Sequence, residues 1–102
     1  MTNSSESSIE VADPFARRLL AKYLERRKKD LVQLRVALSQ NDFESIERTG
    51  HNLYGSGGAY GLEPISDIGA DLERAAQSKD GKRISHIVDA LEAFVTQVTV
   101  AP

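Results

Sequence analysis

Cysteine is absent from the 102 residues, which excludes disulfides, thiol chemistry, cysteine-ligated zinc and iron–sulfur clusters. No window approaches the roughly 18 consecutive apolar residues that a membrane span needs, and no basic start precedes an apolar stretch as in a secretory signal. A phosphate-binding Gly-x-x-x-x-Gly-Lys-Ser/Thr loop, clustered metal-ligand spacing and a Ser-His-Asp set are also missing. We therefore expect a cytoplasmic protein with no membrane contact and no cofactor of its own.

The composition is that of one globular domain, because 40% of the residues are hydrophobic and 27% are charged. Net charge is -2, but residues 14–40 contain eight bases and two acids, whereas residues 41–102 contain five bases and ten acids. The basic segment is suited to meeting an acidic protein surface, although an ordinary solvated helix face has the same composition. A DNA-binding role is disfavoured by the acidic remainder and by the lack of a recognition-helix pattern, so we expect no nucleic-acid partner.

Apolar residues recur at helical spacing in four segments, and no segment has a convincing strand period. Residues 1–12 are Ser-rich and acidic, which predicts a flexible arm, and Asp13-Pro14 is a good helix start. The fold class is thus an all-α, antiparallel up-down four-helix bundle over residues 13–100, with a flexible N-terminal arm. The inward positions include Phe15, Leu19, Tyr23, Leu24, Leu31, Leu34 and Leu38; Phe43, Ile46, Leu53 and Tyr60; Ile65, Ile68, Leu72, Ala75 and Ala76; and Ile84, Ile87, Val88, Leu91, Phe94, Val95 and Val98, with the helical period continuing to Val100.

Residues 55–61 hold four of the seven glycines, and on glycine content alone the second helix would end at Gly55 and a flexible loop would follow. A helical wheel favours a continuous helix instead. On it His51 points about 140° away from the apolar direction, Gly55 and Gly58 lie beside the histidine, and Gly50 and Gly57 fall on the buried side. The glycines then have two functions: they clear the surface around His51, and they let helices approach closely.

An exposed histidine on a cleared surface offers a neutral, nucleophilic ring nitrogen at physiological pH. The second histidine, His86, has no clustered glycines nearby, and we interpret it as solvated surface or a helix-end residue.

The segment His51-Asn52-Leu53-Tyr54-Gly55-Ser56-Gly57-Gly58-Ala59-Tyr60-Gly61, followed by Leu72-Glu73-Arg74-Ala75-Ala76, resembles the histidine-containing phosphotransfer (HPt) domain family. The resemblance implies a four-helix bundle whose second helix presents a phospho-accepting histidine, here His51. It implies response-regulator receiver domains and a sensor (hybrid) histidine kinase as partners. It also implies a phosphorelay carrier without autonomous catalytic activity, with Mg²⁺ in the partner receiver only.

The chain departs from the family pattern at Tyr54, where the family usually has a lysine that supplies positive charge beside the phosphoryl group. A phenol donates only a neutral hydrogen bond. The expected phosphoryl environment and docking surface comprises Tyr54, Gly55, Gly58, Arg48, Glu47 and Ser56. Tyr54 keeps an alternative open, a non-phosphorylated HPt-like interaction module that binds receivers or other signalling proteins. We expect a monomer, because each helix has one apolar stripe.

Overall fold

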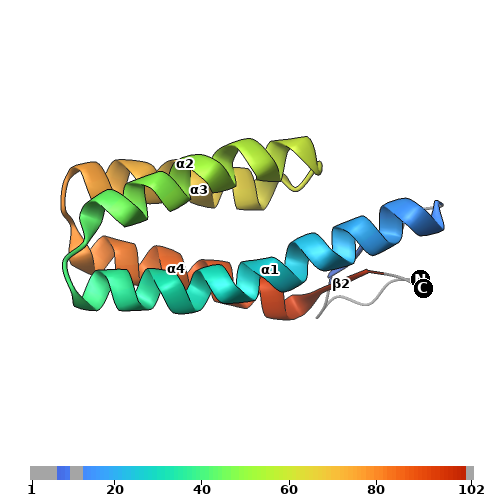
Figure 1. The fold of residues 1–102 in the computed structure, drawn as a ribbon, viewed down its shortest axis with the longest axis horizontal. Helices are drawn as coiled ribbons and strands as arrows, with labels where there is room; N and C mark the ends of the chain where they lie inside the picture. The colour runs from blue at the N-terminus through green and yellow to red at the C-terminus, as the bar shows by residue number, and fades with distance from the viewer. Residues whose placement is uncertain (1–6, 10–12, 101–102) are drawn as a thin grey trace.

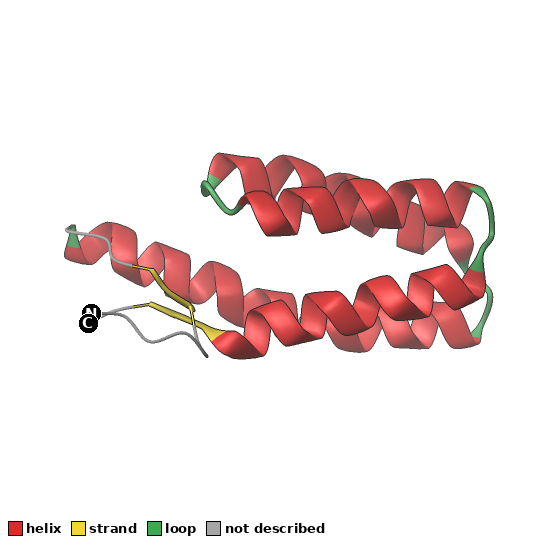
Figure 2. Ribbon diagram, turned by 180° about the vertical axis from the view of Figure 1, so that it is seen from behind, coloured by secondary structure: helices red, strands yellow, loops and turns green. Residues whose placement is uncertain are grey.

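In the computed structural model, which describes residues 7–9 and 13–100, four helices form two layers (Figure 1). Helices α2 (Phe43–Ala59) and α3 (Glu63–Gln77) form one layer, and α1 (Pro14–Ser39) and α4 (Gly81–Gln97) form the other. The predicted all-α four-helix bundle is confirmed. With 26 residues α1 is the longest helix, and its N-terminal part extends past the end of the α2–α3 pair (Figures 1 and 2).

The helix ends follow local capping chemistry. The carboxylates of Asp13, Asp42 and Asp80 accept bonds from first-turn backbone N–H groups of α1, α2 and α4, at 3.0, 3.2 and 3.1 Å. Pro14 and Pro64 stand in the first turns of α1 and α3, where no backbone donor is lost. The start at Asp13-Pro14 agrees with the sequence prediction, because capping depends on neighbouring residues alone.

The core consists of aliphatic residues from all four helices. Among the residues whose burial is described, no polar or charged residue is buried. The largest fully buried side chains are Leu34, Ile46, Leu53, Ile65, Leu72, Ile84, Val88 and Leu91. Across the α1–α4 pair, Arg35 donates to Asp89 at 3.1 Å and to Glu92 at 2.6 Å.

Two short strands depart from the sequence prediction. Ser7–Ile9 (β1) pairs in parallel with Val98–Val100 (β2), so α4 ends at Gln97 and does not continue to Val100. The periodicity failed here because β-branched residues suit either state and a distant strand decided the outcome. Ser7–Ile9 lies in the segment predicted as an arm and is a paired strand here, and the rest of that segment, residues 1–6 and 10–12, lies outside the described residues.

Three residues predicted to point inward are exposed: Phe15, Leu19 and Tyr60. Phe15 and Leu19 belong to the first two turns of α1, and Leu19 lines an open groove together with Ser56 and Tyr60 at the end of α2. Tyr60 follows the last residue of α2 and stacks on Tyr23 of α1, with ring centroids 4.3 Å apart. The helical period predicts a direction, whereas burial also requires a neighbouring helix that extends far enough.

Candidate functional site

His51 lies in the middle of α2 and faces solvent, with 70% of its side chain exposed. The helix continues through the glycine-rich stretch to Ala59, so the continuous-helix prediction is confirmed and the loop alternative is wrong. The imidazole therefore projects from regular, rigid backbone. A reacting group on such a surface is held in a defined direction, which favours in-line attack.

Gly55 and Gly58 leave open space next to this histidine. A Cβ atom built at either position would meet nothing within 4 Å, apart from its own helix backbone. Both positions are exposed, one and two turns after His51. The backbone surface beside the imidazole is therefore accessible to a second macromolecule.

Three other glycines allow α2 and α3 to pack closely together. A Cβ on Gly50 would lie 2.7 Å from the backbone nitrogen of Glu73, and one on Gly57 would lie 2.6 Å from that of Ser66. Gly69 of α3 is packed equally tightly, against the backbone of Tyr54, Gly50 and Leu53. The close approach predicted for Gly50 and Gly57 is confirmed, whereas Gly69 was missed although it interrupts an apolar helical stripe between Ile65 and Leu72.

This close approach brings Glu73 of α3 to the phospho-acceptor candidate. Its Oε2 lies 3.4 Å from Nδ1 of His51, and its side chain is 28% exposed. Glu73 was noted in the sequence only as part of the Leu-Glu pair of the resemblance. Its contact with His51 was missed because it arises from the packing of two helices.

The remaining predicted site residues do not converge on the imidazole. Glu47 accepts a bond from Gln77 of α3 at 3.0 Å, and Arg48 is directed along its own helix to Ser45, at 3.5 Å. Ser56 bonds the Tyr23 hydroxyl of α1 at 2.7 Å. Tyr54 is exposed, and its backbone carbonyl accepts from Ser66 at 2.9 Å.

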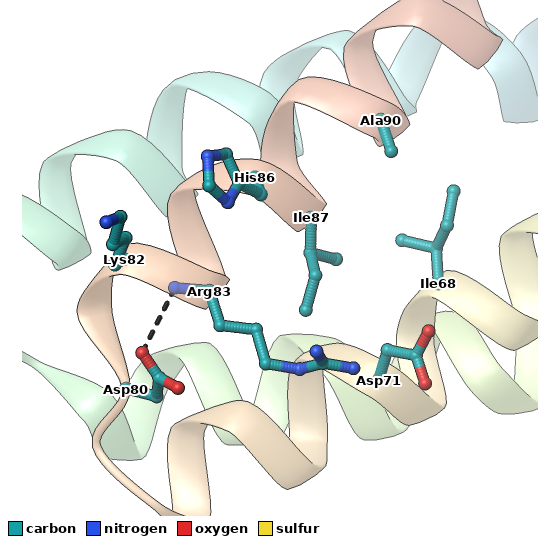
Figure 3. A pocket seen from close by; sticks show the side chains of 8 residues that line it. All are labelled: Ile68, Asp71, Asp80, Lys82, Arg83, His86, Ile87 and Ala90. Carbon is teal, nitrogen blue, oxygen red and sulfur yellow. Dashed lines mark hydrogen bonds between the residues drawn. The ribbon is translucent and has the colours of Figure 1, made fainter.

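His86 is part of a different surface. It is exposed on α4 and lines a groove of about 380 Å³ between α3 and α4, together with Asp71, Asp80, Lys82 and Arg83 (Figure 3). Arg83 extends along this groove toward Asp71, so acids and bases are mixed there. In the described part of the chain, no three His, Cys, Asp or Glu side chains are grouped so as to hold a metal ion.

A four-helix bundle that presents one histidine on an exposed helix, beside glycines that clear its surface, defines the class of histidine phosphotransfer modules. The family model described as "Hpt domain" matches residues 18–100, and the chain belongs to this family. Searches of curated proteins and of solved structures gave no significant match. Hpt domains are histidine-phosphotransfer modules of phosphorelays and interact with receiver domains and kinases.

No helix among the described residues combines the length and the apolar character needed to cross a bilayer.

Proposed function

We propose that His51 accepts a phosphoryl group from a phosphorylated receiver-domain aspartate and passes it to another response regulator. The observation that supports this most strongly is an imidazole that is 70% exposed, beside two helical glycine positions with open space. A partner's aspartyl phosphate has room to approach the ring. The chain acts as a carrier, expected to be cytoplasmic and monomeric, in a bundle spanning residues 13–100.

Glu73 sets the orientation of the reacting ring in this proposal. Its carboxylate, 3.4 Å from Nδ1, favours the tautomer that has its proton on Nδ1 and leaves the lone pair of Nε2 free. Nε2 attacks the phosphorus, the Nε2–P bond forms, and the P–O bond to the partner's aspartate breaks with that carboxylate as the leaving group. Positioning supplies most of the catalysis in such a loose transition state, and we assign Mg²⁺ to the receiver only.

The direct test is incubation with a receiver phosphorylated by ³²P-labelled donor. We expect acid-labile, base-stable label on this chain, and ³¹P NMR should place the phosphoryl group on Nε2 of the ring. Attachment at Nδ1 would contradict the role given to Glu73. Absence of label with every phosphorylated receiver tested would favour the interaction-only module.

Tyr54 is the residue that supports the alternative function, because it replaces the lysine usual in the family. Tyr54→Lys places a positive charge three residues after His51, on a neighbouring part of the helix surface. An exposed charge pair contributes about 0.2–1 kcal/mol, so we expect the transfer rate or the phosphohistidine half-life to rise by up to about fivefold. Tyr54→Phe is the control for loss of the phenol, and identical kinetics for Lys and Phe would refute the argument from charge.

Gly55→Leu tests whether the cleared surface matters. The open space around this position accommodates the side chain, and removing a helical glycine should raise the free energy of unfolding by up to about 1 kcal/mol. We expect the rate of phosphoryl transfer to fall at least tenfold, because the Leu side chain would occupy the approach to His51. Ala93→Leu, exposed on α4 in the other layer, is the matched control. Equal transfer by the wild type and Gly55→Leu would rule out the steric explanation.

A further inference from the structure

A groove of about 490 Å³ lies between the first half of α1 and the C-terminal end of α2. We call it the basic groove. Its lining residues are Leu19, Lys22, Tyr23, Arg26, Arg27, Ser56 and Tyr60.

Ring stacking and one hydrogen bond make the floor of the basic groove rigid. Tyr23 of α1 stacks on Tyr60 at 4.3 Å between ring centroids, and its hydroxyl shares a 2.7 Å hydrogen bond with Ser56. The Arg27 guanidinium also lies over the Tyr23 ring, 4.1 Å from its centre. Preformed walls of this kind lower the entropy lost on binding.

The charge of the basic groove has one sign. Three of its seven lining residues are basic and none is acidic. The α3–α4 groove, by contrast, contains Asp71 and Asp80 beside its bases, and a groove at the other end of α1 and α2 contains both Asp42 and Arg48. Of these three surface grooves, the basic groove is the one whose lining residues include bases but no acid.

Two of the three bases are available to a partner. Arg27 is largely covered, with 13% of its side chain exposed and Nε 3.0 Å from Asp30, although the N–H does not point at that oxygen. Lys22 and Arg26 are exposed, and among the described residues neither forms an ion pair. Leu19 and Tyr60 contribute exposed apolar surface beside these cations.

An exposed path joins the basic groove to His51. Ser56 follows His51 by five residues, which is about 7.5 Å along the axis of α2 and about 140° around it. Asn52 and Gly55 lie in between, and both are exposed. One docked domain is wide enough to cover both the basic groove and His51, because a standard interface buries about 800 Å² on each partner.

We propose that the basic groove docks an acidic helix of the receiver domain, with Asp or Glu side chains facing Lys22 and Arg26 and an apolar side chain resting between Leu19 and Tyr60. This inference rests on the proposed function for the identity of the partner. The groove contact lies outside the reacting centre, so the affinity for the receiver and the rate of phosphoryl transfer depend on different residues.

The test measures binding separately from transfer. The probe is the receiver domain that binds this chain most tightly, chosen by calorimetry and not by transfer. It is titrated into the His51→Gln chain, with and without Lys22→Glu/Arg26→Glu. We expect the charge-reversed chain to bind at least tenfold more weakly, and the difference to shrink as salt is raised.

A matched control changes net charge by the same amount elsewhere. Lys28→Glu/Lys82→Glu alters two exposed lysines outside the basic groove, and we expect its affinity to stay within about twofold of the parent. Thermal unfolding of each variant checks that the bundle is intact. If both double variants bound the receiver equally weakly, the inference would be overturned. It would also be overturned if this chain self-associated and only Lys22→Glu/Arg26→Glu abolished that self-association.

The two proposals fail in distinguishable ways. If no receiver labels the chain but the tightest one still loses affinity only in the groove variant, the proposed phosphoryl transfer is wrong and the docking inference holds. If label is transferred and the groove variant binds as tightly as the parent, the docking inference is wrong and the proposed function holds.

Discussion

Replacing His51 by Gln is expected to abolish phosphate incorporation from a phosphorylated receiver completely. Glutamine keeps a polar side chain of similar reach but has no nucleophilic ring nitrogen to form the phosphorus bond. The His51 side chain is 70% exposed, so the free energy of unfolding should change by no more than about 0.5 kcal/mol. Label transfer and thermal unfolding, measured on the same preparation, separate loss of chemistry from loss of fold.

His86→Gln is the control for this experiment, because the residue is also exposed and lies on α4, in the α3–α4 groove. We expect it to incorporate as much label as the wild type. Label that persists in His51→Gln would show that another residue carries the phosphoryl group. Loss of label in His86→Gln would assign the acceptor site to α4.

Gly69→Ala is expected to lower the free energy of unfolding by about 2–3 kcal/mol, which is a large part of the total for a domain of this size. The added Cβ would lie 2.6 Å from the carbonyl oxygen of Gly50 and 2.9 Å from the carbonyl carbon of Leu53, and would also press on the backbone nitrogen of Tyr54. Backbone atoms cannot rotate away as a flexible side chain can, so α3 must move off α2. The usual helix-propensity gain of Gly to Ala, about 1 kcal/mol, offsets only part of this cost.

Gly58→Ala provides the matched comparison, since the same chemical change is made where a Cβ meets open space. We expect Gly58→Ala to raise the free energy of unfolding by about 0.5–1 kcal/mol and Gly69→Ala to lower the melting temperature by about 10–20 °C. Denaturant and thermal unfolding both measure this difference. Similar stability in the two variants would contradict the close helix contact.

Gly69→Ala also has a consequence for the site. Glu73 lies one turn after Gly69 on α3, and its distance from the His51 ring depends on how closely α3 approaches α2. The glycines at the helix contact therefore position the carboxylate as well as stabilise the bundle.

Local features of the fold were predictable from neighbouring residues. Asp13 caps α1 as predicted, because a carboxylate two residues before a free backbone N–H can reach it in any tertiary context. The outward direction of His51 and the inward direction of Gly57 follow from 100° of rotation per residue along one helix. These predictions needed no knowledge of what packs against α2.

Predictions that depended on a partner element were less successful. Leu19 and Tyr60 were placed inside because the period pointed them there, but both are exposed and line an open groove between α1 and the end of α2. Arg48 and Glu47 flank His51 on the wheel, yet each is bonded in another direction, to Ser45 and to Gln77. Long polar side chains adopt the contacts that the surrounding helices offer, and a helical wheel does not contain those helices.

The sequence by itself determined the start of the first helix, the continuity of α2 through its glycines, and the choice of His51 as the exposed candidate, because each of these depends on residues within a few positions of one another. Only the tertiary structure decided that Glu73 lies 3.4 Å from the imidazole, that Gly69 lets α3 approach so closely, and that Tyr23 and Tyr60 form the floor of a basic groove. Those features join residues that are far apart in the chain, and their distances are set by how the packed helices fit together.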